Sequence, residues 1–386
     1  MKKEHRKYFC IFGGGAVRGI VYLGAIRAMK EKNIEITGYA GASAGSIAAV
    51  ITALEYSDEE MAEIFNSIDY MLFRDLNFSF KIELAISKGE VFTDKIRAII
   101  EKKMGTKEPV TFKDFPKNIY IVTSNLTTGE SVIFSKETTP DFEVAQAVRI
   151  SSGFPGLMNP VELNGEYLVD GDLAKPCALS QLSSLLNPEN EKILEFRIEG
   201  TKKQKLPTNP LSFLNNGIDF LNNISTDNAV KTFGGKEKYD FIVFPVEDIL
   251  LFDFNLSTEQ KDYLVDLGYK TTIEFFENTL PKKEKEFLTC YSEMKNMLES
   301  SFSDLINRKY DKAKDKILLY ISKNYKIFGR LDKRITDKLD EIAESFNDDI
   351  KKVFFIIPTM DNHQLVKSLI KKLISMLDEK INSNYE

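Results

Sequence analysis

The sequence is poor in residues on which several familiar kinds of chemistry depend. Its 386 residues include no tryptophan, three cysteines and only two histidines. Cys10, Cys177 and Cys290 are widely spaced and form no CxxC pair, so we expect reduced thiols rather than disulfides or metal ligands. The sequence therefore predicts no metal site, and any enzyme built on it has to work with few histidines.

Long hydrophobic runs and an excess of positive charge are also missing. No apolar run approaches the roughly 20 residues of a membrane-spanning helix, and the N-terminus lacks the apolar core of a signal peptide. The formal net charge is -6, which gives no argument for a nucleic-acid partner. We therefore expect a cytoplasmic protein with no signal peptide, no transmembrane segment and no nucleic-acid partner.

The most specific pattern in the chain is Gly41-Ala42-Ser43-Ala44-Gly45. An apolar run precedes it and a helix-like pattern follows it. In this G-x-S-x-G element, Gly41 and Gly45 permit a sharp turn from a strand into a helix, with the serine at the turn. The Ser43 hydroxyl then stands at a helix N-terminus, where the dipole favours developing negative charge. Ser43 is the predicted nucleophile.

Neither histidine is well placed to activate Ser43. His5 lies in a charged N-terminal lead, and His363 lies near the start of a distant C-terminal amphipathic helix. A Ser-His-Asp triad normally takes its histidine from a loop after a late strand of the same domain. The sequence therefore favours a carboxylate as the activating group.

A glycine-rich turn, Gly13-Gly14-Gly15-Ala16-Val17-Arg18-Gly19, lies between an expected strand and an expected helix. Such turns also bind nucleotide phosphates. No Lys-Ser or Lys-Thr pair follows, however, and alanine at position 16 breaks the G-x-G-x-x-G register. The alternative is an oxyanion hole made by the backbone N–H groups of Gly14 and Gly15, where losing one donor typically costs about 10²–10³ in rate.

The candidate carboxylate is in Asp170-Gly171-Asp172, directly after the expected strand Glu166 to Val169. Catalytic groups of α/β folds gather at strand ends, and Gly171 permits a tight turn there. A buried aspartate bonded to a serine can take its proton during attack. The simpler alternative is that Asp170 only stabilises a turn, which is the usual role of an Asp-Gly pair.

Strands and helices alternate up to about residue 280, which predicts an α/β fold. The strand signal then nearly disappears, and residues 282–386 indicate several helices rich in lysine, aspartate and glutamate. We place a domain boundary near residue 281. Residues 1–281 form the expected catalytic domain.

The ordered combination of these elements resembles the patatin-like phospholipase family. The glycine-rich turn with Arg18, the G-x-S-x-G element at Ser43 and the D-G-x element at Asp170 occur in the family's order, without a usable histidine. Two further stretches, Ile150 to Leu157 and Leu256 to Tyr269, are also similar to the family. The resemblance covers roughly residues 8–280.

The resemblance implies a three-layer sandwich with a central, mostly parallel sheet, followed by the helical C-terminal region. It implies a lipid acyl hydrolase of the phospholipase A type with a Ser43–Asp170 dyad and without metal or organic cofactor. Gly14 and Gly15 would be the oxyanion donors, with Gly13, Ala16, Gly19, Gly41, Gly45 and Gly171 supporting the motifs. Arg18 would hold the glycine loop or face a lipid phosphate.

Two positions depart from the family pattern. Ala16 replaces a frequent glycine, and we expect little harm because alanine still offers its N–H. Asp172 stands where glycine or alanine is usual. Its carboxylate either raises the pKa of Asp170 by like-charge repulsion or points to solvent.

Two segments bear on membranes and regulation. Asp69 to Ile86 is either a lid at a lipid-entry surface or a packed helix edge. The apolar stripe from Leu365 to Leu377 is a membrane-surface helix, the core of a helix bundle or an oligomer seam. The resemblance implies peripheral membrane association, and we expect residues 282–386 to serve regulation, targeting or oligomerisation, through an activator or a second copy.

One functional alternative to catalysis remains: a catalytically silent protein that binds lipids or partners on the same fold. The joint presence of Ser43, Asp170 and the glycine turn argues against it.

Overall fold

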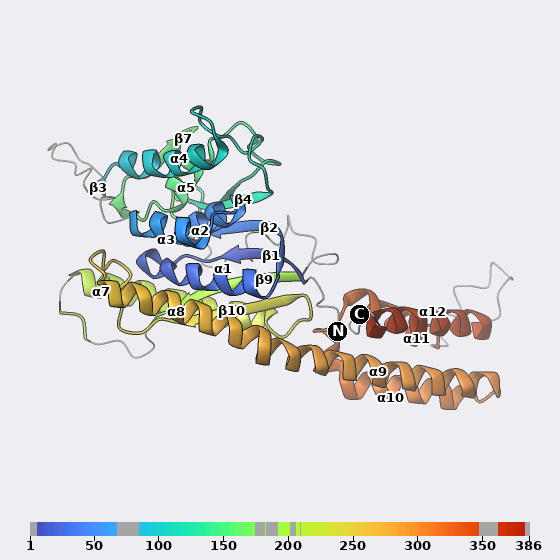
Figure 1. Cartoon of the computed structure of the whole chain (residues 1–386). Coiled ribbons are helices and arrows are strands. Elements are labelled where there is room, and N and C mark those ends of the chain that lie inside the picture. The colour runs from blue at the N-terminus through green and yellow to red at the C-terminus, as the bar shows by residue number, and fades with distance from the viewer. Residues whose placement is uncertain are drawn as a thin grey trace. The chain divides into compact units, whose positions relative to one another are not determined.

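A computed structural model describes residues 6–67, 85–173, 182, 192–200, 206–208, 210–346 and 362–382. The described chain divides into two compact units (Figure 1). Residues 6–234 and 239–276 form an α/β unit, and residues 235–238 with 277–382 form a helical unit. The chain thus passes into the second unit after Phe276, a few residues before the predicted boundary at 281.

The α/β unit is built on one large mixed sheet with the strand order β10-β9-β1-β2-β4-β8-β7, and β5 pairs with β4. The first five strands in that order run parallel, while β5 and β8 are antiparallel to β4 and β7 is antiparallel to β8. The strands are β1 (Lys7–Phe12), β2 (Glu35–Ala42), β4 (Ile119–Asn125), β5 (Ser131–Phe134), β7 (Val161–Leu163), β8 (Glu166–Val169), β9 (Lys192–Glu199) and β10 (Tyr239–Pro245). A separate parallel pair consists of β3 (Ala85–Ser87) and β6 (Gly156–Met158).

Helices pack on both faces of this sheet. They are η1 (Ala16–Ile20), α1 (Val21–Glu31), α2 (Ala44–Ala53), α3 (Asp58–Ser67), α4 (Glu90–Met104), α5 (Val144–Ser151), α7 (Pro210–Phe233), α8 (Thr258–Glu274) and the π-helical η3 (Phe275–Thr279). Alternating residues of β1 separate the faces. Phe12 contacts Tyr22 of α1, whereas Phe9 and Ile11 share a core cluster with Ala229 of α7.

The central strands are buried on both faces, as parallel strands covered by helices require. Tyr8 to Phe12 of β1 are all buried, which explains why this segment is an uninterrupted apolar run rather than an alternating one. The expectation of a mostly parallel α/β sandwich followed by a helical region is confirmed.

The helical unit has its own hydrophobic core. It contains α9 (Leu280–Ile306), α10 (Tyr310–Phe328), α11 (Lys333–Glu344) and α12 (Asn362–Asn382). The apolar stripe of α12 lies in this core, with Ile370, Leu373 and Leu377 fully buried. Of the alternatives for this stripe, the structure therefore shows the core of a helix bundle.

A short second piece of chain, residues 235–238, belongs to the same unit although it lies between α7 and β10 in the sequence. Arg330 Nε donates to the Gly235 carbonyl at 2.7 Å. Lys380 Nζ lies 2.8 Å from the Glu237 carboxylate. The helical unit is thus discontinuous in sequence.

Within the residues that the structure describes, no helix combines the length and the apolar character needed to cross a membrane. The predicted lid, Asp69 to Ile86, lies mostly outside the described residues.

Candidate functional site

Ser43 stands between the end of β2 and the first residue of α2, with backbone angles of φ 51° and ψ −127°. A non-glycine residue rarely adopts this conformation, and strained backbone of this kind gathers at functional sites. The flanking glycines make the turn possible. A Cβ on Gly45 would lie 2.0 Å from the Phe12 carbonyl oxygen, and one on Gly41 would lie 2.2 Å from that of Gly45.

Two neighbouring serines hold the strained turn. The backbone N–H of Ser43 donates to Ser151 Oγ at 3.0 Å, and Ser151 Oγ donates to the Val122 carbonyl at 2.6 Å. Ser46 Oγ donates to the Ser43 carbonyl at 2.6 Å. Sequence reasoning assigned no role to Ser46 or Ser151, although Ser151 lies in one of the stretches that carry the family resemblance.

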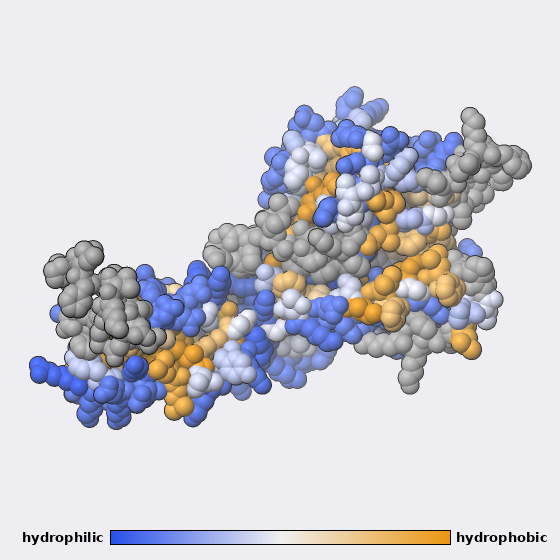
Figure 2. All heavy atoms as spheres, turned by 180° about the vertical axis from the view of Figure 1, so that it is seen from behind, coloured by the Kyte–Doolittle hydropathy of each residue, from blue (hydrophilic) through white to orange (hydrophobic). Residues whose placement is uncertain are grey.

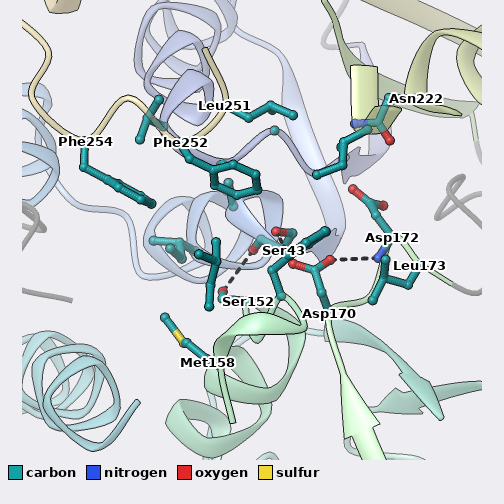
Figure 3. A pocket seen from close by; sticks show the side chains of 18 of the residues that line it. Ser43, Ser152, Met158, Asp170, Asp172, Leu173, Asn222, Leu251, Phe252 and Phe254 are labelled. Carbon is teal, nitrogen blue, oxygen red and sulfur yellow. Dashed lines mark hydrogen bonds between the residues drawn. The ribbon is translucent and has the colours of Figure 1, made fainter. Parts of the chain in front are cut away.

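The structure brings Asp170 to Ser43. The Ser43 hydroxyl donates to Asp170 Oδ2 at 2.7 Å, across 127 positions of sequence (Figure 3). Asp170 follows β8, and its N–H donates to the Gly153 carbonyl at 3.0 Å. Gly171 is required behind it, because a Cβ there would lie 2.2 Å from the Val122 carbonyl oxygen.

The environment of Asp170 makes its carboxylate more basic than usual. Burial is the largest cause and the charge of Asp172 the second, and together they raise the pKa of Asp170 to about 7, against the lowering by the Asp172 N–H and the Ser43 hydroxyl. A carboxylate with a pKa near neutrality can accept a proton from an attacking hydroxyl.

The glycine-rich turn lies beside the same pair. A Cβ on Gly14 would approach the Ser43 Cβ to 3.1 Å and the Asp172 Oδ2 to 1.8 Å, so glycine is needed there. The Gly13 N–H donates to the Phe196 carbonyl at 3.0 Å, which ties the turn to β9. Gly19 lets η1 approach α2, since a Cβ there would lie 2.9 Å from that of Ala44.

Ala16 has a backbone conformation that favours glycine. Its φ is 47°, in the left-handed region that costs an L-residue roughly 1–2 kcal/mol. Glycine would adopt this conformation without that cost, so the alanine adds strain to the turn.

Asp172 faces the site rather than solvent. It lines the pocket together with Ser43 and Asp170, and its Oδ1 is buried without a hydrogen-bond partner in the structure. Burial raises the pKa of Asp172, while the Arg197 guanidinium and the Gly14 N–H act to lower it. The carboxylate therefore competes for the N–H that the sequence assigns to an oxyanion hole.

Arg18 holds the glycine turn and does not face the pocket. Its side chain is 2% exposed and forms a two-pronged ion pair with Asp219 of α7. Arg18 Nε also donates to the Ile249 carbonyl at 2.7 Å. These contacts favour the loop-holding role among the two considered for Arg18.

Ser43 opens into a pocket of about 1300 Å³, part of which is open solvent. Most of its lining is hydrophobic and comes from η1, α2, α4, α7 and the loops around residues 154 and 252 (Figure 3). The hydrophobic lining residues include Val17, Ile20, Ile47, Phe92, Phe154, Leu157, Met158, Leu173, Ile218, Leu221, Leu251, Phe252 and Phe254. An apolar pocket with a few convergent polar groups suits a fatty acyl chain next to its ester.

Among the described residues, no histidine lines this pocket, and no group of three or more His, Cys, Asp or Glu is placed to hold a metal ion. His363 lies on α12 of the helical unit, and His5 is outside the described residues.

Comparisons with known proteins point to one family. The family model for patatin-like phospholipases matches residues 10–182. Uncharacterized protein R571 of Acanthamoeba polyphaga mimivirus is 30% identical over 277 residues, covering 67% of this chain and 90% of that protein. Probable lipid hydrolase 463L of Invertebrate iridescent virus 6 is 27% identical over 204 residues, covering 50% of this chain and 70% of that protein.

A solved structure shares the fold. VipD from Legionella pneumophila superposes with a TM-score of 0.51 at 15% sequence identity, covering 97% of this chain and 92% of that one.

Proposed function

Because this chain belongs to the patatin-like phospholipase family, we propose that it is a carboxylic ester hydrolase that releases fatty acids from phospholipids or other acyl lipids. Ser43 is the nucleophile and Asp170 is the general base. The observation that carries the proposal is the 2.7 Å hydrogen bond from the Ser43 hydroxyl to Asp170 at the mouth of an apolar pocket.

In the first half-reaction, Ser43 Oγ attacks the ester carbonyl carbon while Asp170 takes the hydroxyl proton. The carbonyl oxygen becomes an oxyanion, for which Gly14 and Gly15 offer backbone N–H groups and α2 offers its N-terminus. The intermediate collapses to an acyl-serine, and the leaving alcohol takes the proton from Asp170.

In the second half-reaction, Asp170 removes a proton from water, which attacks the acyl-serine. The second tetrahedral intermediate releases the fatty acid, and the proton held by Asp170 returns to Ser43 Oγ. Each proton that Asp170 accepts is given back, so the dyad is regenerated without a cofactor.

The test is fatty-acid release from mixed phospholipid vesicles by the full chain. Ser43→Ala and Asp170→Asn are each expected to lower the rate by about 10³-fold or more, as loss of a nucleophile or its base does in serine hydrolases. Ser152→Ala is the matched control. Its hydroxyl lies in the same pocket, 3.4 Å from the Ser43 carbonyl, and most of the activity should remain.

Labelling with a fluorophosphonate separates this proposal from the catalytically silent alternative. An enzyme that needs an activator is labelled at Ser43 even when vesicle lipids are not cleaved. Absence of both labelling and fatty-acid release would make the chain a lipid- or partner-binding protein on the same fold.

The proposal also assigns different functions to the two parts of the chain. Residues 1–281 carry the hydrolase, and residues 282–386 regulate it, target it to membranes or mediate self-association. The separate core of α9 to α12 supports this division.

A further inference from the structure

Helix α7 is polar on its buried side and hydrophobic on its exposed side, the reverse of an ordinary surface helix. Asn215, Asp219 and Thr226 are each no more than 2% exposed. On the opposite side, Phe213 is 70% and Phe220 62% exposed. Exposed hydrophobic residues are common singly, but a whole helical face of them needs an explanation.

The buried polar side chains fix this orientation. Asp219 forms the ion pair with Arg18. The Asn215 Oδ1 accepts from the Leu251 N–H at 2.7 Å, and its Nδ2 donates to Asp219 at 3.1 Å. Rotating α7 to bury its hydrophobic face would break a buried ion pair and leave a charge without its partner, which is strongly destabilising.

The exposed hydrophobic residues form one continuous face. Phe213, Phe220 and Ile224 follow the spacing i, i+7 and i+11 of a helical stripe, and Leu214 and Leu221 lie next to it. Figure 2 shows hydrophobic surface on the part of the molecule formed by the α/β unit, and a further hydrophobic patch on the helical unit.

This face is continuous with the pocket. Leu221 is 59% exposed and also lines the cavity that holds Ser43, together with Ile218 and Asn222 of the same helix. Leu221 therefore joins the hydrophobic outer face of α7 to the lining of the pocket.

The face is also almost free of charge. Between residues 211 and 226 the only ionisable side chain is Asp219, and it is buried against Arg18. The exposed charges of α7, Asp227 and Lys231, lie beyond this stretch, towards the C-terminal end of the helix. In a chain in which 28% of residues are charged, an uncharged outer face over residues 211–226 suits a surface that excludes water.

We propose that the face formed by Phe213, Leu214, Phe220, Leu221 and Ile224 docks the α/β unit on the acyl region of a lipid surface and presents lipids to the pocket. The docking partner is lipid hydrocarbon, and anionic head groups contribute little because the face carries no lysine or arginine. This docking role rests on the proposed hydrolase function for its purpose, but binding itself is measured without turnover.

The experiment compares full-length wild type with Phe213→Gln and Phe220→Gln in sedimentation with phosphatidylcholine vesicles. Neither residue is among those that line the pocket. Each variant is expected to bind about tenfold or more weakly, since removing most of a phenyl ring from an apolar site costs more than the 1.4 kcal/mol that a factor of ten represents. Raising the salt concentration from 50 to 500 mM should change wild-type binding less than about twofold, since electrostatic attraction contributes little.

Tyr325→Gln is the matched control, because Tyr325 is an aromatic residue of α10 that is 64% exposed; it should bind like wild type. A soluble monomeric ester supplies the second readout. Its hydrolysis should be unchanged in Phe213→Gln and Phe220→Gln, whereas hydrolysis of vesicle lipids falls with binding.

Three results would overturn the docking role. The first is vesicle binding equal to wild type in both variants. The second is a loss of activity on the monomeric ester as large as the loss on vesicle lipids. The third is a wild-type dimer that Phe220→Gln dissociates, which would make a second copy of the chain the occupant of this face. Binding measured in Ser43→Ala keeps the two proposals separate. If wild type hydrolyses nothing but the α7 variants still lose vesicle binding, only the proposed hydrolase function has failed.

Discussion

At the scale of single residues, the second aspartate of Asp170-Gly171-Asp172 changes the site most. Its carboxylate stands against Gly14 and raises the pKa of Asp170. Arg197 acts to lower the pKa of Asp172 itself and lies 3.4 Å from Glu195. Burial together with the Asp172 charge raises the pKa of Tyr22, so the phenol stays neutral. After burial, the Asp172 charge is thus the second cause of the raised pKa at which the proposed base works.

Asp172→Asn is expected to move the acidic limb of kcat/KM to lower pH. The base acts only when ionised, so activity of wild type should rise as the pH passes about 7. Removing the neighbouring negative charge lowers the pKa of Asp170 and shifts the rise downward. The measurement is kcat/KM on a soluble ester between pH 5 and 9.

Asp141→Asn is the control for this profile, because Asp141 is an exposed aspartate paired with Lys113, and it should leave the limb in place. An unchanged limb in Asp172→Asn would mean that burial alone sets the pKa of Asp170.

At the scale of elements, close contact between α1 and α8 depends on two glycines that face each other's helix. A Cβ on Gly24 would lie 1.9 Å from the Val265 carbonyl oxygen, and one on Gly268 would lie 1.9 Å from that of Val21. Gly268 belongs to the Leu256–Tyr269 stretch that resembles the family, and this contact gives the stretch a physical reason. Because α1 follows η1 directly, the contact also supports the glycine turn.

Gly268→Ala is expected to destabilise the α/β unit by roughly 1–3 kcal/mol, because the added methyl group forces two helices apart. Gly217→Ala on α7 should have the opposite sign. Nothing lies within 4 Å of a Cβ there, and alanine in a helix interior gains about 0.5–1 kcal/mol over glycine. Thermal unfolding of both variants is the measurement, and equal shifts would refute the contact argument.

The elements also show how much the sequence alone could predict. Strands β1, β2 and β4 carry local signals, namely apolar runs bounded by glycine or polar residues, and Ser43 and Asp170 are recognisable from short glycine-containing patterns. The orientation of helix α7 cannot be predicted from the sequence, because its polar residues point inward and its hydrophobic ones outward. That inversion depends on Arg18, which is 201 positions from Asp219 and whose partner no local pattern identifies.

The remaining differences have the same origin. The strain at Ala16 depends on a backbone conformation that its small side chain does not reveal. The position of Asp172 over Gly14 depends on how β8 and β1 are placed in one sheet. Motifs of a few consecutive residues can be recognised in the sequence, whereas contacts between residues on different strands of the sheet cannot.

At the scale of the whole molecule, the two units have separate cores and are expected to unfold in separate transitions. Leu373→Ala in the helical core should lower one transition, with a cost of about 2–5 kcal/mol, while fluorophosphonate labelling of Ser43 persists above it. Ile121→Ala, equally buried in the sheet, should instead lower the transition at which labelling is lost. The measurement is calorimetry, with fluorophosphonate labelling of samples taken at each temperature. A single unfolding transition shared by both units in both variants would contradict the prediction of separate transitions.

The four residues 235–238 have a consequence for how such a protein can be recombined. If the helical unit were one continuous stretch of sequence, a single crossover between two related genes would exchange the complete unit. A chimera that takes only residues 277–382 from one parent protein receives Arg330 and Lys380 from that parent. Their partners, the carbonyl at position 235 and the carboxylate at position 237, then come from the other parent protein. The two pieces are therefore expected to be inherited together, and a working chimera has to transfer both.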